Sequence, residues 1–84
     1  MDIHPDRHVT VCCGSTETML ATLMAVLNPG DEVLIPTPYW VSYSDLVSMT
    51  GAVPVLLPAS LEEGFRLPAE RLEKAITPRT KMVL

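Results

Sequence analysis

The chain has 84 residues, of which 48% are hydrophobic, and its formal net charge is −4. This length fits one domain at most, and the apolar content is too high for a disordered tail. Acidic and basic residues are mixed without a basic cluster, so nucleic acid and an anionic membrane are poor partners. The longest apolar stretch, within residues 19–27, is far shorter than the roughly 20 residues that cross a bilayer.

Two features of the N-terminal part bear on the compartment. The charged residues 1–8 lack the apolar core of a secretory signal. Cys12 and Cys13, the only cysteines, are adjacent and do not resemble the disulfide framework of a small secreted domain. We therefore expect a cytoplasmic protein.

Short apolar runs alternate with helical patterns along the chain. Strands are predicted at residues 8–13, 32–35, 53–57 and 81–84, and helices at residues 15–27, 40–49 and 68–76. Pro54 removes a hydrogen-bond donor from the third strand, which favours an edge position. The β-α-β-α-β-α-β order predicts a three-layer α/β/α fold with a mostly parallel sheet. Since the last apolar run has no loop or cap after it, we expect a piece of a larger α/β domain.

The segment VCCGSTE joins the first predicted strand to the first predicted helix, and three interpretations compete for it. Gly14, Ser15 and Thr16 could form a phosphate site, because a helix N-terminus presents free N–H groups and partial positive charge. Alternatively, Gly14 makes a tight turn and Ser15 caps the helix. The segment lacks the further glycines and the lysine of a P-loop. From the residues alone, both interpretations stay open.

The third interpretation is a metal or redox site at the two cysteines. Neighbouring residues of a strand point to opposite faces, so Cys12 and Cys13 are not expected to bind one metal together. No histidine or further cysteine lies at the spacing of a zinc site. We expect buried free thiols that act as small hydrophobic side chains.

Aromatic residues follow the second predicted strand, in the segment PTPYW. They lie at the carboxyl edge of the predicted sheet, where open α/β folds bind ligands. Tyr39 and Trp40 could stack on a planar heterocycle, or an aromatic ring could fill the gap between loop and core. The two lysines, Lys74 on a predicted solvent face and Lys81 at the amino end of a strand, are poorly placed to form a Schiff base.

Nearly the whole chain resembles the large domain of class I (aspartate-type) aminotransferases. These are enzymes of fold type I that depend on pyridoxal 5′-phosphate (PLP). The segments that carry the resemblance are, in order, strand-Gly-Ser-Thr, NPGDEV, P-x-P-Y-W-x-x-Y and ITPRTK. The resemblance implies that residues 1–84 are a partial PLP-binding large domain.

The family pattern also implies roles for individual residues. Ser15 and Thr16 would hold the cofactor phosphate, with Gly14 permitting the close approach, and Trp40 would stack on the pyridine ring. The substrates of the full-length enzyme would be an amino acid and a 2-oxo acid, and the full-length form would be a homodimer. The Schiff-base lysine of the family lies much further along the sequence, so we expect this chain alone to be inactive.

Two alternatives remain beside the aminotransferase. Other fold-type-I enzymes, such as a C–S lyase or a cyclopropane-forming synthase, share the appearance of this segment, and the residues that distinguish them lie outside it. A small non-catalytic α/β binding module is the other possibility. It would fold cooperatively as a monomer without a cofactor.

Overall fold

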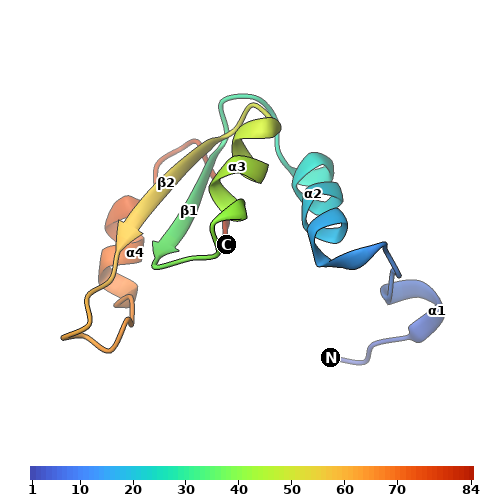
Figure 1. Ribbon diagram of the computed structural model, residues 1–84, viewed down its shortest axis with the longest axis horizontal. Coiled ribbons are helices and arrows are strands. Elements are labelled where there is room, and N and C mark those ends of the chain that lie inside the picture. The colour runs from blue at the N-terminus through green and yellow to red at the C-terminus, as the bar shows by residue number, and fades with distance from the viewer.

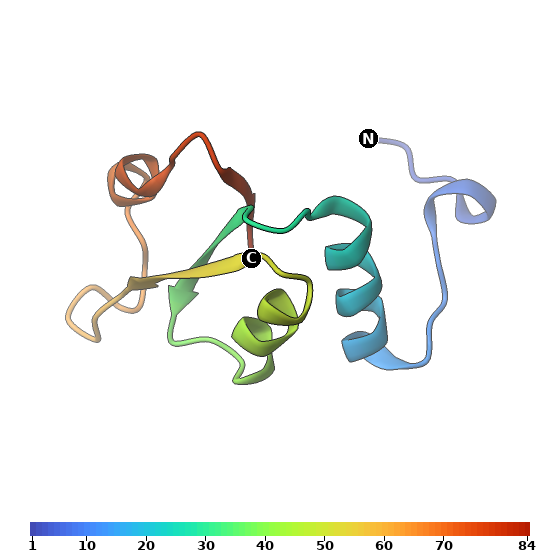
Figure 2. The same cartoon turned by 90° about the horizontal axis from the view of Figure 1, so that it is seen from above.

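The computed structural model describes residues 1–84 as an α/β unit. Its elements are α1 (Pro5–His8), α2 (Gly14–Val26), β1 (Glu32–Thr37), α3 (Ser42–Met49), β2 (Val53–Pro58), α4 (Ala69–Ala75) and β3 (Thr80–Val83). The strands are parallel and lie in the order β2-β1-β3. Helices α2 and α3 lie on one side of the strands and α4 on the other (Figures 1 and 2). The α/β/α fold class and the parallel sheet are therefore confirmed, and β2 is an edge strand, as Pro54 predicted.

The central strand β1 carries the core. Val33, Leu34 and Ile35 are fully buried, which is typical of a parallel strand covered on both faces. Val33 and Ile35 belong to a cluster with residues of α2, α3 and the connections after them: Leu23, Leu27, Leu46, Val47 and Ala52. Leu34 lies outside this cluster, because alternate side chains of a strand point to opposite faces.

Helix α2 packs one face against the core. Its apolar residues run nearly all round the helix. In the structure Leu23 is buried, whereas Met24 is 66% and Val26 is 39% exposed. The hydrogen bond from the Leu27 N–H to the Leu23 carbonyl, 2.8 Å long, closes the helix. No helix in the structure combines the length and the apolar character that a membrane crossing requires.

The strand predicted at residues 8–13 is wrong. Residues 5–8 form the single turn α1, and residues 9–13 run outside the sheet to the start of α2 (Figure 2). A strand needs a neighbour to pair its N–H and C=O groups, and the chain offers this segment none. Its β-branched composition therefore indicated a conformation that this chain alone does not stabilise.

Helix α3 begins two residues later than predicted, at Ser42. Leu46 and Val47 are buried, whereas Val41 and Met49 are 73% and 71% exposed. The buried pair is what fixes α3 against the sheet.

A buried carboxylate joins the first strand to the last. The side chain of Glu32 is 11% exposed, and its Oε1 accepts a hydrogen bond of 3.1 Å from Nε of Arg79. Its Oε2 accepts one of 3.0 Å from the Thr77 hydroxyl. The backbone N–H of Glu32 donates to the Arg79 carbonyl at 2.8 Å. These contacts hold the amino end of β1 against the turn that leads into β3.

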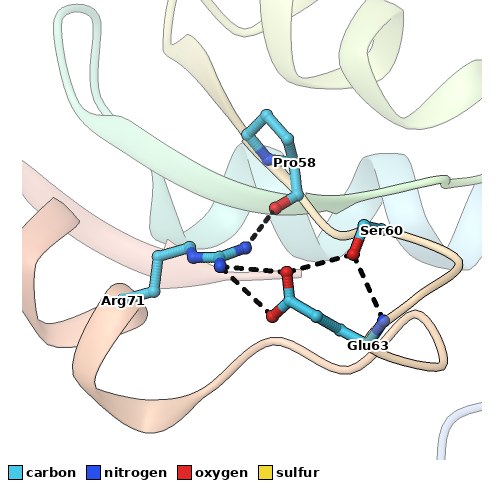
Figure 3. A network of polar contacts seen from close by, with 4 residues as sticks. All are labelled: Pro58, Ser60, Glu63 and Arg71. Carbon is cyan, nitrogen blue, oxygen red and sulfur yellow. Dashed lines mark hydrogen bonds and ion pairs between the residues drawn. The ribbon is translucent and has the colours of Figure 1, made fainter.

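A second polar network holds the loop between β2 and α4 (Figure 3). Arg71 donates to the Pro58 carbonyl at 2.7 Å and, through Nη2, to both carboxylate oxygens of Glu63 at 3.1 Å. The Ser60 hydroxyl donates to Glu63 at 3.1 Å. One guanidinium therefore joins the end of β2, the loop and α4.

This network predicts a pH-dependent loop. The hydrogen bonds from Arg71 and then Ser60 lower the pKa of Glu63 below that of an ordinary glutamate. The network therefore stabilises the loop fully above the pKa of glutamate in an unfolded chain, and this stabilisation is lost as the pH falls through the lowered pKa. In an NMR titration we expect the pKa of the Glu63 carboxyl to lie below that of an ordinary glutamate, and to rise toward it in Arg71→Gln. An unchanged titration in Arg71→Gln would contradict the assignment.

Candidate functional site

The start of α2 and the start of α3 enclose a cavity of about 160 Å³. Part of its lining follows the carboxyl end of β1 in the chain. Its lining residues are Ser15, Thr16, Met19, Trp40, Ser42, Tyr43 and Leu46. Three of the four residues predicted to bind a cofactor therefore border one space, although Trp40 is far from Ser15 and Thr16 in sequence. Gly14, the fourth, directly precedes this lining without being part of it.

The first turn of α2 presents unpaired backbone donors. The N–H of Gly14 donates to the Cys12 carbonyl at 3.0 Å, and the N–H of Cys13 donates to the Glu17 carboxylate at 2.8 Å. The N–H groups of Ser15 and Thr16 have no acceptor within the chain. Free N–H groups at a helix N-terminus attract anions through hydrogen bonding and the helix dipole. This end of the cavity therefore suits a phosphate.

The backbone conformation favours glycine where α2 begins. Gly14 has a φ of +85°, in the left-handed region that other residues rarely adopt. A Cβ there would meet no atom within 4 Å. The backbone conformation that aims the following N–H groups, rather than lack of space, therefore favours glycine.

The two aromatic residues of PTPYW have different surroundings. The Tyr39 hydroxyl donates to Oγ of Ser44 at 3.1 Å, and the partly buried ring packs against the core. Trp40 is 66% exposed and borders the cavity. The gap-filling role thus falls to Tyr39, and the ring available for stacking is that of Trp40.

Tyr43 also lines the cavity, and no role was predicted for it. The N–H of Tyr43 donates to the Trp40 carbonyl at 3.0 Å, in the turn that opens α3. Residues three apart in a helical turn lie on one face. Its spacing from Trp40 was the sequence signal that could have identified it.

The cavity is smaller than a complete ligand pocket. Sites for small molecules usually enclose about 300–1,000 Å³. With a volume of about 160 Å³, the cavity is therefore only part of such a pocket. Its donors suit a phosphate and its indole suits a planar ring, so the residues present fit a phosphorylated heterocycle such as PLP. Neither Lys74 nor Lys81 borders it.

The parallel sheet, the helices on both faces and the cavity lined in part by residues that follow a strand end place the chain in the class of open α/β folds. Comparison with known families makes this specific. The model of the family "aminotransferase class I and II" matches residues 1–84, and the chain belongs to this family.

Individual relatives agree with the family match. The chain is 54% identical over 76 residues to an aspartate aminotransferase of Rhizobium meliloti, covering 90% of this chain and 18% of that protein. It is 56% identical over 73 residues to an aspartate/prephenate aminotransferase of Cereibacter sphaeroides, again covering 18% of the relative. The chain thus spans about a fifth of the length of these relatives.

Solved structures share the same arrangement. A crystal structure of the Rhizobium meliloti aspartate aminotransferase superposes with a TM-score of 0.85, over 88% of this chain and 18% of that one. A single mutant of the Thermus thermophilus aspartate aminotransferase, 42% identical, also gives 0.85, over 90% and 21% of the two chains. The fold described above is therefore that of a part of an aspartate aminotransferase.

Proposed function

We propose that residues 1–84 form part of the PLP-binding large domain of an aminotransferase. The whole enzyme would transfer an amino group between an amino acid and a 2-oxo acid. The observation that carries this proposal is that Ser15 and Thr16, whose backbone N–H groups are unpaired, border the same cavity as Trp40. The relatives are named aspartate aminotransferase and aspartate/prephenate aminotransferase, which favours aspartate as amino donor.

Each proposed contact uses a group that is free in the structure. Ser15 and Thr16 would bind the cofactor phosphate through their N–H groups and hydroxyls, with Gly14 setting the backbone conformation. Trp40 would lie against one face of the pyridine ring and orient it. When bound, the cofactor supplies the electron sink for chemistry at the substrate. The chain contributes binding and orientation.

The family relationship extends the proposal to the whole enzyme. We infer a homodimer in the full-length form. We also infer a cytoplasmic location, which suits two free thiols at Cys12 and Cys13. Because Lys74 and Lys81 do not border the cavity, we expect no turnover of aspartate and a 2-oxo acid by this chain alone.

The proposal is tested with pyridoxine 5′-phosphate, an analogue without the aldehyde, which cannot react with lysines. Binding is measured by isothermal titration calorimetry and compared with binding of pyridoxine. Hydrogen bonds to a charged group contribute roughly 1.5–3 kcal/mol each, so the phosphate should strengthen binding roughly 10-fold or more. In Trp40→Ala we expect binding about 2–12-fold weaker, since stacking of aromatic rings contributes about 0.5–1.5 kcal/mol.

Val41→Ala is the matched control, because Val41 is the next residue, is exposed and does not border the cavity. It should bind the analogue as the unchanged chain does. Equal affinity for pyridoxine with and without its phosphate would contradict the proposed phosphate site. With PLP itself, borohydride trapping of one cofactor per chain at Lys74 or Lys81 would contradict the expected lack of a Schiff-base lysine.

A further inference from the structure

Trp40 lies in the connection that joins β1 to α3, outside both elements. It is 66% exposed, so the core does little to fix its side chain. A backbone hydrogen bond of 3.0 Å, from the N–H of Tyr43 to the Trp40 carbonyl, holds the side of Trp40 that leads into α3. The side that follows β1 needs another anchor if the indole is to keep one place.

Tyr39 provides this anchor at two points. Its partly buried ring packs against the core cluster. Its hydroxyl donates a partly buried hydrogen bond of 3.1 Å to Oγ of Ser44, which belongs to α3. The bond therefore reaches from the residue before Trp40 to a residue of the following helix. One side chain thus ties the connection to α3 across Trp40.

The anchor lies outside the cavity. Tyr39 and Ser44 are not among its lining residues, whereas Trp40 is. Any effect of Tyr39 on a bound ring must therefore pass through Trp40. A side chain that moves freely has to be ordered when a ligand binds, and this ordering weakens binding. An indole that is held beforehand does not carry this cost.

We propose that Tyr39 is a positioning residue, which holds Trp40 at the cavity through its hydrogen bond to Ser44. The inference rests on the proposed function, because the indole needs a fixed place in order to stack on the cofactor ring. It assigns Tyr39 to the binding of the ring and not to the binding of the phosphate, whose donors belong to the first turn of α2.

The first test uses the chain without a cofactor. Trp40 is the only tryptophan, so its fluorescence anisotropy, excited where tyrosine does not absorb, reports how firmly the indole is held. Tyr39→Phe keeps the ring in the core and removes only the hydroxyl. We expect a loss of anisotropy, with the helices retained by circular dichroism. Unchanged anisotropy would overturn the proposal.

Ser44→Ala and Ser48→Ala make a matched pair in α3. Ser44→Ala removes the acceptor and should lower the anisotropy as Tyr39→Phe does. Ser48 is one turn further along, and its hydroxyl donates to the Ser44 carbonyl at 2.9 Å rather than to Tyr39. Ser48→Ala should leave the anisotropy unchanged. An equal loss in Ser48→Ala would overturn the proposal, because any hydroxyl removed from α3 would then loosen Trp40.

The second test measures binding of pyridoxine and pyridoxine 5′-phosphate by calorimetry. In Tyr39→Phe we expect both to bind about 2-fold more weakly or worse, and no more weakly than in Trp40→Ala. The ratio of the two affinities should stay the same, since the phosphate donors are untouched. A loss confined to the phosphorylated compound would overturn the proposal, as a general loosening of the site would not spare the phosphate.

A double variant tests whether Tyr39 acts through Trp40. Adding Tyr39→Phe to Trp40→Ala should cause no further loss of affinity, because the group that Tyr39 holds is already gone. A further loss would overturn the proposal. If the unchanged chain bound neither compound, the proposed cofactor site would be wrong, whereas the anisotropy would still decide whether Tyr39 holds Trp40.

Discussion

Replacing Leu23 with alanine is expected to lower the free energy of unfolding by about 2–5 kcal/mol. Leu23 is fully buried, and it packs from α2 into the cluster that contains Val33 and Ile35 of β1. Alanine would remove apolar contact and leave a cavity between helix and sheet. Since small domains are stable by only about 5–15 kcal/mol, the loss is a large part of the total.

Met24→Ala is the control for this change. Met24 is the next residue of the same helix and is 66% exposed, so its truncation should shift stability little. The measurement is urea unfolding followed by circular dichroism, with the midpoint and slope compared among the three chains. Equal midpoints for Leu23→Ala and Met24→Ala would contradict the packing of α2 against β1.

The second large loss in the free energy of unfolding is expected when Glu32, which joins β1 to the turn before β3, is replaced with glutamine. Glu32→Gln keeps the shape but leaves one acceptor oxygen for two donors, the Thr77 hydroxyl and the Arg79 guanidinium. A buried polar group left unpaired costs about 1–3 kcal/mol. The part of this cost that comes from losing the contact with Arg79 is at the low end of the range, because the Arg79 side chain is 74% exposed and water screens its charge.

The control is Glu73→Gln, which removes one negative charge from an exposed position of α4. It should unfold at nearly the same urea concentration as the unchanged chain. Hydrogen exchange locates the effect: Glu32→Gln should speed exchange in β3 and leave α3 protected. Unchanged exchange in β3 would indicate that the carboxylate does not hold this strand.

The sequence predicted the part of the fold in which each element meets its partner within the chain. From residue 32 onward, each predicted strand and helix is found, with ends shifted by a few residues. The strand at residues 8–13 failed because apolar, β-branched composition indicates a tendency to pair but not the presence of a neighbour. For the same reason, the expectation that Cys12 and Cys13 are buried was wrong: Cys13 is exposed and Cys12 is partly exposed.

The roles of the candidate site residues stay predictions, although three of these residues lie together in the structure. Ser15, Thr16 and Trp40 follow from their positions at a helix start and after a strand, and the structure brings them to one cavity. Away from this cavity, the bond between Glu32 and Thr77 joins residues 45 positions apart, so no local pattern reveals it. Contacts of this kind depend on strand order, which local patterns do not fix.

The central place of β1 has a consequence for how the chain assembles. Glu32 pairs with Val53 on one side and with Thr80 on the other, which are 21 (53 − 32) and 48 (80 − 32) positions away. Closing the longer loop loses more chain entropy, and contacts distant in sequence form more slowly. We therefore expect β1, α3 and β2 to assemble before β3 joins, and β3 to be the first strand to separate when the sheet opens.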